Sequence, residues 1–172
     1  GRLLFELEDY VGAMDCFIAA VASHSDNYET KGRCYCNMGI LCQKAGNCEL
    51  AYQMYVKSHD CFRQANDTIA VMYAKDDIAV ALAKMHKKTE CLKILDGIAD
   101  SCNDNSVLAH TKIIRAILYR HLEQYDSALI YADEYLGYDP DETSALLIKA
   151  QSFSSTGVKD SAVYYAKQVI DD

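Results

Sequence analysis

Acids, histidines and cysteines are the side chains through which this chain could perform chemistry, and their spacing predicts no reaction centre. Asp76 and Asp77 are paired carboxylates of the kind that glycoside hydrolysis requires, and Glu6, Glu8 and Asp9 form a second acidic group. We expect both groups at helix starts or on exposed faces, where acids complement the helix dipole. The five histidines lack the spacing of a metal site. The sequence therefore predicts no catalytic residue, no metal and no cofactor.

The chain has eight cysteines, but their positions do not suit a disulfide framework. Cys34 and Cys36 are two residues apart on an expected helix, so they point to roughly opposite sides. Cys42 and Cys91 fall at repeat positions that require small apolar residues. We interpret the cysteines as free thiols that act as small hydrophobic side chains and expect no intramolecular disulfide. Free thiols favour a reducing, cytoplasmic compartment; the alternative is the extracytoplasmic part of a membrane-anchored bacterial protein.

Composition narrows the class of protein further. A single proline, eight glycines and the lack of alternating apolar residues predict an all-α chain. The formal net charge of −8 argues against direct binding of nucleic acid, because phosphate backbones are held by many lysines and arginines. No apolar stretch approaches the ~20 residues that cross a bilayer, so we predict no membrane-spanning segment.

A small residue is followed 12 positions later by a second small residue, five times along the chain. The second residues of these pairs succeed one another at intervals of 38, 40, 37 and 34 positions. A fixed interval inside a longer period is the signature of a repeat array of helical hairpins. Because the interval of 12 does not change, we expect one turn geometry inside every hairpin and all length variation between hairpins. The five pairs are Gly1/Ala13, Gly39/Ala51, Ala79/Cys91, Ala116/Ala128 and Ala150/Ala162.

The most complete repeat lies in residues 31–58, where helices are expected over 31–46 and from 47 onward. Its characteristic residues are Tyr35, Met38, Gly39, Cys42, Gly46, Ala51, Tyr55 and Ser58. This skeleton resembles the tetratricopeptide repeat family, and the other repeats match it less completely but in register. The resemblance implies a right-handed α-solenoid of about five tetratricopeptide-like hairpins with longer than standard spacing. As one array it would fill residues 1–172, with repeats over 1–25, 26–66, 67–103, 104–140 and 141–172.

The chain departs from the family pattern in several places. It has no tryptophan, and Arg115 and Lys149 stand where the family has a leucine. Only the last repeat has the family's 34-residue spacing, with Pro140 in the turn. The extra residues of the other repeats predict helices that are longer by about one turn. Because the chain opens inside an expected helix, we expect a fragment of a larger bacterial protein in which the array continues.

In a tetratricopeptide-like superhelix the first helix of each hairpin lines the concave face. The resemblance therefore implies that a protein or peptide partner contacts an apolar strip with a few basic and aromatic neighbours, which would suit a peptide carrying a few acids. The alternative is that the longer helices bury these residues in packing between repeats. The expected partner-binding residues are Phe5, Arg33, Ile40, Gln43, Tyr73, Val80, His110, Ile113, Ile117, Arg120 and Gln151.

These observations favour a non-catalytic scaffold for protein–protein interaction. The resemblance extends to arrays that form the sensory or regulatory part of bacterial signalling proteins. Two alternatives remain open: the docking region of an enzyme whose catalytic domain lies outside this chain, and an assembly or secretion adaptor. Self-association through exposed array ends is a further interaction that such an array permits.

Overall fold

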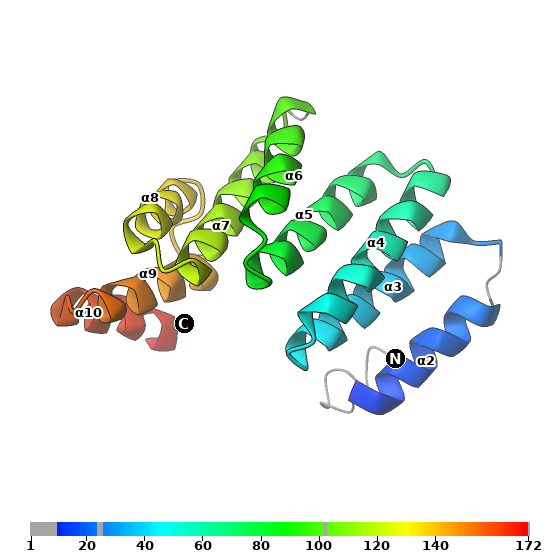
Figure 1. Ribbon diagram of the computed structural model, residues 1–172, viewed down its shortest axis with the longest axis horizontal. Helices are drawn as coiled ribbons and strands as arrows, with labels where there is room; N and C mark the ends of the chain where they lie inside the picture. The colour runs from blue at the N-terminus through cyan, green and yellow to red at the C-terminus, as the bar shows by residue number, and fades with distance from the viewer. Residues whose placement is uncertain (1–9, 24–25, 102, 172) are drawn as a thin grey trace. The chain divides into compact units, whose positions relative to one another are not determined.

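The computed structural model describes residues 10–23, 26–101 and 103–171, and within these ranges the protein is all-α, as predicted (Figure 1). The described part contains nine helices and no strand. The helices are α2 (Tyr10–Ser23), α3 (Tyr28–Lys44), α4 (Cys48–Gln64), α5 (Thr68–Lys84), α6 (Lys88–Ser101), α7 (Asn105–His121), α8 (Tyr125–Leu136), α9 (Thr143–Ser155) and α10 (Lys159–Asp171).

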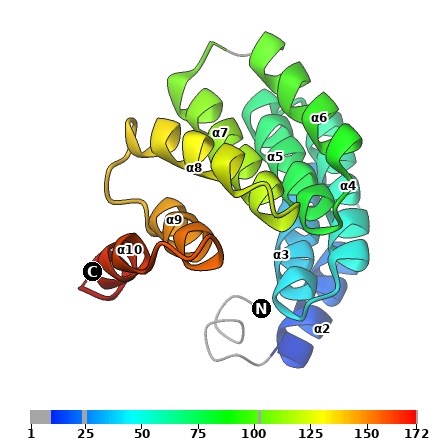
Figure 2. The same ribbon diagram turned by 60° about the vertical axis from the view of Figure 1, so that its left-hand side comes forward.

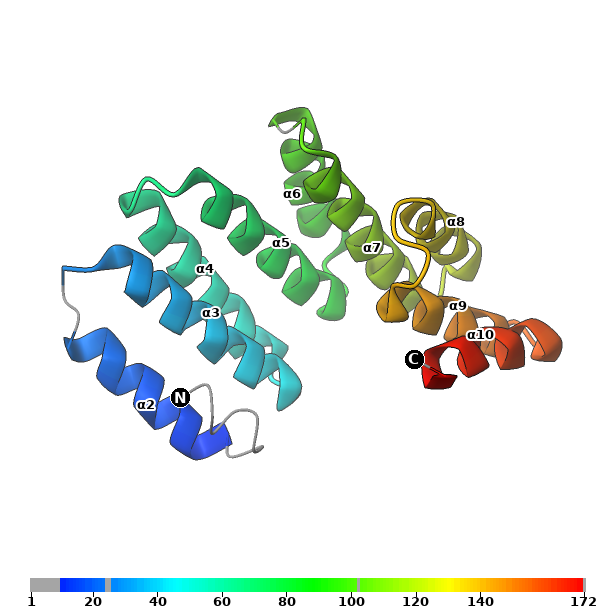
Figure 3. The same cartoon turned by 180° about the vertical axis from the view of Figure 1, so that it is seen from behind.

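The chain forms two compact units, residues 1–81 and residues 82–172, and the boundary falls within α5. We call them the N-terminal unit and the C-terminal unit and describe each by itself. In the N-terminal unit α2 packs on α3 and α3 packs on α4, as Figure 3 shows from behind. In the C-terminal unit each of α6 to α10 packs on the next, and α7 also contacts α9 (Figure 2).

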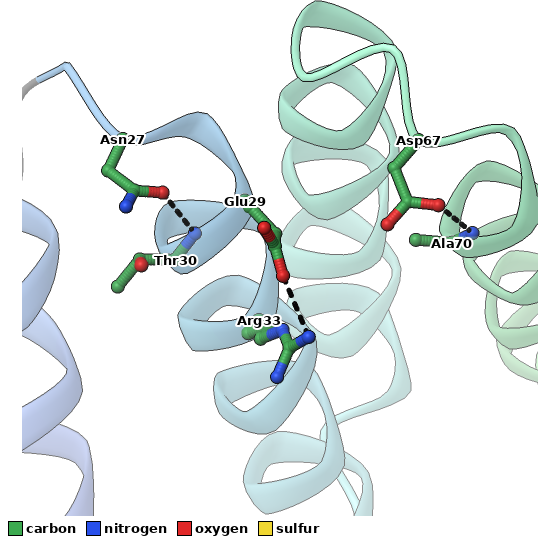
Figure 4. A network of polar contacts seen from close by, with 6 residues as sticks. All are labelled: Asn27, Glu29, Thr30, Arg33, Asp67 and Ala70. Carbon is green, nitrogen blue, oxygen red and sulfur yellow. Dashed lines mark hydrogen bonds and ion pairs between the residues drawn. The ribbon is translucent and has the colours of Figure 1, made fainter.

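Polar residues begin several helices at the connections between hairpins. The side chain of Asn27 accepts a hydrogen bond from the Thr30 N–H at 2.9 Å, and the side chain of Asp67 accepts one from the Ala70 N–H at 3.0 Å (Figure 4). Asp104 caps α7 in the same way. These bonds satisfy backbone donors that have no partner within the helix, and each contributes about 1 kcal/mol.

Helix length follows repeat length, as predicted. The helices α3, α5 and α7 have 17 residues each, whereas α9, in the repeat with standard spacing, has 13. All four end five residues after the small residue of their repeat, so the additional residues lie at their N-terminal ends. The second helices all begin three residues before their small residue and differ at their C-terminal ends. Length therefore varies only at the end of each hairpin that faces away from its internal turn.

The turn inside each hairpin has one geometry, which explains the constant interval of 12. A residue with positive φ lies seven positions after the first small residue in four successive repeats. Its N–H bonds the carbonyl three residues earlier, and the next N–H bonds the carbonyl five residues earlier, which closes the helix as a Schellman motif. The four residues are Gly46 (φ 79°), His86 (60°), Glu123 (58°) and Gly157 (81°).

We expect Glu123→Gly to stabilise the protein and Gly157→Ala to destabilise it. A side chain strains the left-handed backbone, so each change should alter the free energy of unfolding by about 0.5–1 kcal/mol, with opposite signs. A methyl group at Gly157 would meet no neighbouring atom, so a loss there reports backbone strain alone. Urea unfolding measures both variants. Equal stability of both variants and the wild type would contradict a common turn geometry.

The small residues of the repeat are almost all buried. Ala13, Ala51, Ala79, Cys91, Ala116 and Ala128 are all 0% exposed, and Gly39 and Ala150 are buried too. Ala162 in α10 is half-buried. The approach is closest at Gly39, which lies against the ring of Tyr55. The Tyr55 hydroxyl donates to the side-chain oxygen of Gln43 at 3.2 Å, which holds the ring over the glycine.

Arg115 and Lys149, each one position before the first small residue of its repeat, occupy equivalent places in the C-terminal unit. Arg115 donates to Asp96 of α6 at 2.6 Å and lies over the ring of Tyr131 in α8, 5.9 Å from the centroid. It thus reaches both the preceding and the following helix. The spacing in the sequence carries a signal for this contact. Asp96 lies five positions after the second small residue of its repeat, Cys91, and Tyr131 lies three positions after that of the next repeat, Ala128.

Lys149 repeats this arrangement one hairpin later. Its ammonium donates to Asp133 of α8 and lies 4.1 Å from the centroid of the Tyr165 ring in α10. Burial lowers the pKa of Lys149, but the hydrogen bonds and charges of Asp133 and Tyr165 outweigh that effect and raise it overall. Two successive repeats therefore each hold a cation between a carboxylate and an aromatic ring.

Candidate functional site

The predicted partner-binding residues differ widely in exposure. The residues six positions before the small residue are all exposed, namely Arg33, Tyr73 and His110, and Gln151 is exposed as well. Ile113 is only 5% exposed, so it contributes to packing in the C-terminal unit and is not available to a partner. Phe5 lies outside the described residues. The remaining five are half-buried: Ile40, Gln43, Val80, Ile117 and Arg120.

Asp76 and Asp77 correct one expectation from the sequence. Both lie in the middle of α5, not at a helix start, and Asp76 is 2% exposed. Asp77 is half-buried and accepts a hydrogen bond from the Cys36 thiol at 3.4 Å. Burial therefore reaches two of the residues that lie three positions before a small residue, Asp76 and Ile113, but it covers Cys36 only in part and leaves Leu147 exposed.

A mostly apolar hollow of about 280 Å³ lies in the N-terminal unit between α3, α4 and α5. It brings together two of the predicted residues, Arg33 and Tyr73. Tyr73 is 51% exposed, so its ring offers apolar surface that the protein itself does not cover. The hollow is lined by Arg33, Cys36, Asn37, Phe62, Ala70, Tyr73, Ala74 and Asp77.

The charged groups of this apolar hollow are partly committed to internal partners. Arg33 forms an ion pair with Glu29 one helical turn earlier, with 2.7 Å between Nη2 and Oε1 (Figure 4). Both side chains are well exposed, so the pair contributes little to stability and leaves Arg33 able to contact a partner. Burial, with the charge and hydrogen bond of Asp77, raises the pKa of the Cys36 thiol to about 12. This cysteine is therefore a protonated, unreactive donor at neutral pH.

A second, polar hollow of about 440 Å³ lies in the C-terminal unit between the end of α7, the start of α8 and α9. It brings together two other predicted residues, Arg120 and Gln151. Sequence reasoning missed the polar neighbours that complete it, because they belong to the turn and to a different helix. The lining residues are Arg120, His121, Glu123, Tyr125, Gln151, Ser154 and Ser155.

Arg120 and His121 are coupled within this polar hollow. The Arg120 Nη2 lies 2.9 Å from His121 Nε2, and a neutral imidazole accepts this hydrogen bond. Burial is the main cause that lowers the pKa of His121 to about 4, and the positive charges of Arg120 and Lys84 and the neighbouring His86 lower it further. Burial also lowers the pKa of Arg120, which remains a cation at neutral pH. The polar hollow thus presents one guanidinium beside an uncharged histidine.

The predicted apolar strip is not assembled within one unit. Ile40 and Val80 belong to the N-terminal unit, and Ile117 belongs to the C-terminal unit. The half-buried Gln43 accepts a hydrogen bond from the buried Tyr55, so its side chain serves the packing of α3 on α4. The continuous strip stays a prediction, whereas the two hollows are features of the separate units.

Among the described residues, no group of three histidine, cysteine or acidic side chains is arranged to hold a metal ion. Seven of the eight cysteines lie in the described ranges as thiols outside any disulfide, and Cys34, Cys42 and Cys91 are buried; Cys102 lies outside the described residues. In the described part of the chain, no helix has the length and apolar character needed to span a bilayer.

No protein-family model matches the chain, and no curated protein matches it.

Proposed function

We propose that the chain is a non-catalytic interaction scaffold, built as a tetratricopeptide-like α-solenoid, that binds a protein or peptide partner. Three features support the repeat architecture. Consecutive helices pack as hairpins, the same Schellman turn recurs at the same register, and in the C-terminal unit α7 contacts α9, the equivalent helix of the next hairpin. Arrays of this kind present extended surfaces to partners.

The observation that carries the proposed function is the apolar hollow of the N-terminal unit. Its lining joins apolar surface from three helices with an exposed aromatic ring, Tyr73, and a basic side chain, Arg33. Aromatic and arginine side chains around a concave apolar surface are the residues that contribute most to protein–protein binding. We propose that an apolar side chain of the partner enters this hollow and that an acidic neighbour contacts Arg33.

Selection of peptides from a random library on the purified chain tests this proposal. We expect selected peptides to combine an apolar residue with an acid, and Tyr73→Asp to weaken their binding by about tenfold or more, because it removes a central aromatic contact. Arg33→Glu should weaken binding more at low salt than at high salt.

Tyr138→Asp is the matched control. Tyr138 is 52% exposed and Tyr73 is 51% exposed, so the two tyrosines are equally accessible. Tyr138, however, lies in the C-terminal unit and lines neither hollow. Its substitution should leave binding within about twofold, since surface changes outside a hot spot cost little. Circular dichroism would establish that all variants remain folded. If folded Tyr73→Asp and Arg33→Glu variants bind the selected peptides as the wild type does, the apolar hollow is not the recognition surface.

A further inference from the structure

Arg120 is a half-buried cation without a carboxylate partner. Arg33 and Arg115 each form an ion pair, with Glu29 and Asp96, whereas Arg120 forms none with any residue that the structure describes. Its Nε is buried and donates no hydrogen bond there, and Nη2 is bonded only to the neutral His121. A buried donor of a charged group that lacks an acceptor costs free energy, which a bound anion would recover.

The polar hollow beside Arg120 has the room and the donors for such an anion. Its volume is about 440 Å³, and the amide of Gln151 and the hydroxyls of Ser154, Ser155 and Tyr125 line it. These uncharged groups can each donate to an oxygen. They come from two helices, α8 and α9, whereas Arg120 belongs to α7.

Glu123 restricts the charge of the anion. It lines the same hollow, yet it forms no ion pair with Arg120. With His121 uncharged at neutral pH, the lining carries one positive and one negative charge. A dianion such as phosphate would therefore meet repulsion that a single carboxylate largely avoids, and the planar guanidinium matches a carboxylate in geometry.

We infer that the polar hollow binds one carboxylate side chain, from a glutamate or an aspartate of the protein partner, on the Arg120 guanidinium. This inference deepens the proposed function and rests on it for the source of the carboxylate. His121 acts as a positioning residue, because it accepts from Nη2 and so orients the guanidinium toward the hollow. The hollow of each unit would then contact the partner differently, through apolar contacts in one and through charge in the other.

The test uses N-acetyl-glutamate N-methylamide as the probe, because its side-chain carboxylate is its only charge. The whole chain is titrated at pH 7 while nuclear magnetic resonance follows the Nε–H signal of each arginine. We expect a saturable shift of the Arg120 signal in the millimolar range, as for one charge-assisted contact, and at least about fivefold weaker binding of the glutamine analogue.

Three variants separate this site from general charge attraction. Arg120→Gln should abolish saturable binding of the glutamate probe. Glu123→Gln should tighten it about two- to threefold, because a repelling charge is removed. Arg63→Gln, which removes an exposed arginine of α4 outside the polar hollow, should leave it unchanged. Thermal unfolding of each variant identifies any variant that fails to fold. If Arg120→Gln fails to fold, the Glu123→Gln result remains decisive.

The outcomes of this experiment differ from those of the peptide selection. Equal shifts with the glutamate and glutamine probes, or no shift of Arg120 with either, would overturn the inference. Neither result would contradict the proposed binding of a partner at the apolar hollow. Inorganic phosphate that binds Arg120 about tenfold more tightly than the glutamate probe would identify a phosphate site instead. If the Tyr73→Asp variant still binds the glutamate probe, the carboxylate site is independent of the apolar hollow. That conclusion would hold even if the Tyr73→Asp change did not weaken binding of the selected peptides.

Discussion

Replacing Gly39 by alanine should lower the free energy of unfolding by about 1–3 kcal/mol, as overpacking of a tight contact does. A methyl group at Gly39 would lie 2.6 Å from Cδ1 of Tyr55, well inside van der Waals contact. The ring cannot move aside easily, because Tyr55 is 2% exposed and its hydroxyl is bonded to Gln43. For a chain of this size the midpoint of thermal unfolding should fall by about 2–12 °C.

Gly97→Ala is the matched control for this prediction. Gly97 lies within α6, and a methyl group there would meet no neighbouring atom. Alanine is favoured over glycine inside a helix by about 1 kcal/mol, so this variant should be more stable than the wild type. The same chemical change should thus have opposite signs at the two positions. A Gly39→Ala protein as stable as Gly97→Ala would show that α3 and α4 do not approach closely at Tyr55.

Asp133→Ala should destabilise the C-terminal unit, because it leaves the ammonium of Lys149 without its carboxylate. The Lys149 side chain is 8% exposed, whereas Asp133 is 59% exposed, so solvent screens part of the interaction. We therefore expect a loss of about 1–3 kcal/mol, less than the 3–5 kcal/mol for a fully buried pair. Lys149→Met removes the charge and keeps most of the volume. It should recover much of the loss when combined with Asp133→Ala.

The neighbouring residue Glu134 supplies the control. It pairs with Lys112 at 3.4 Å, but both side chains are 40% or more exposed, so Glu134→Ala should cost no more than about 0.5 kcal/mol. The pH dependence has a defined sign. Because the pKa of Lys149 is raised in the folded protein, its contribution is complete below the ordinary lysine pKa and is lost as the pH rises through the folded value. Equal stability of Asp133→Ala and Glu134→Ala would contradict the arrangement around Lys149.

The sequence predicted the features that depend on local periodicity. The all-α class, the longer helices, the internal turns and the burial of small residues such as Ala51 and Cys91 all follow from spacing and residue size. Arg33, Tyr73 and His110 belong to the partner-binding set that the resemblance implied, and they are exposed, although burial of that set was left open as the alternative. These features need no knowledge of how one helix crosses another.

The features that sequence reasoning missed depend on contacts between helices. Asp76 and Ile113 share a register position with Cys36, yet the first two are buried and Cys36 is half-buried, because each meets a different neighbouring helix. The hydrogen bond from Cys36 to Asp77 joins residues 41 positions apart. Such contacts are fixed by the position of helices in space, which periodicity does not specify.

The two ends of each hairpin offer different opportunities for protein engineering. At the internal turns, one added residue would rotate everything after it by about 100° and break the Schellman bonds, so these turns tolerate no insertion. The opposite ends already accommodate helices of unequal length, and the connection between Leu136 and Thr143 lacks the Schellman bonds that also close α4 at Asn66. Closing a longer loop between Leu136 and Thr143 costs little, because the cost grows only with the logarithm of its length. Affinity tags, fluorophores or cleavage sites belong in that connection.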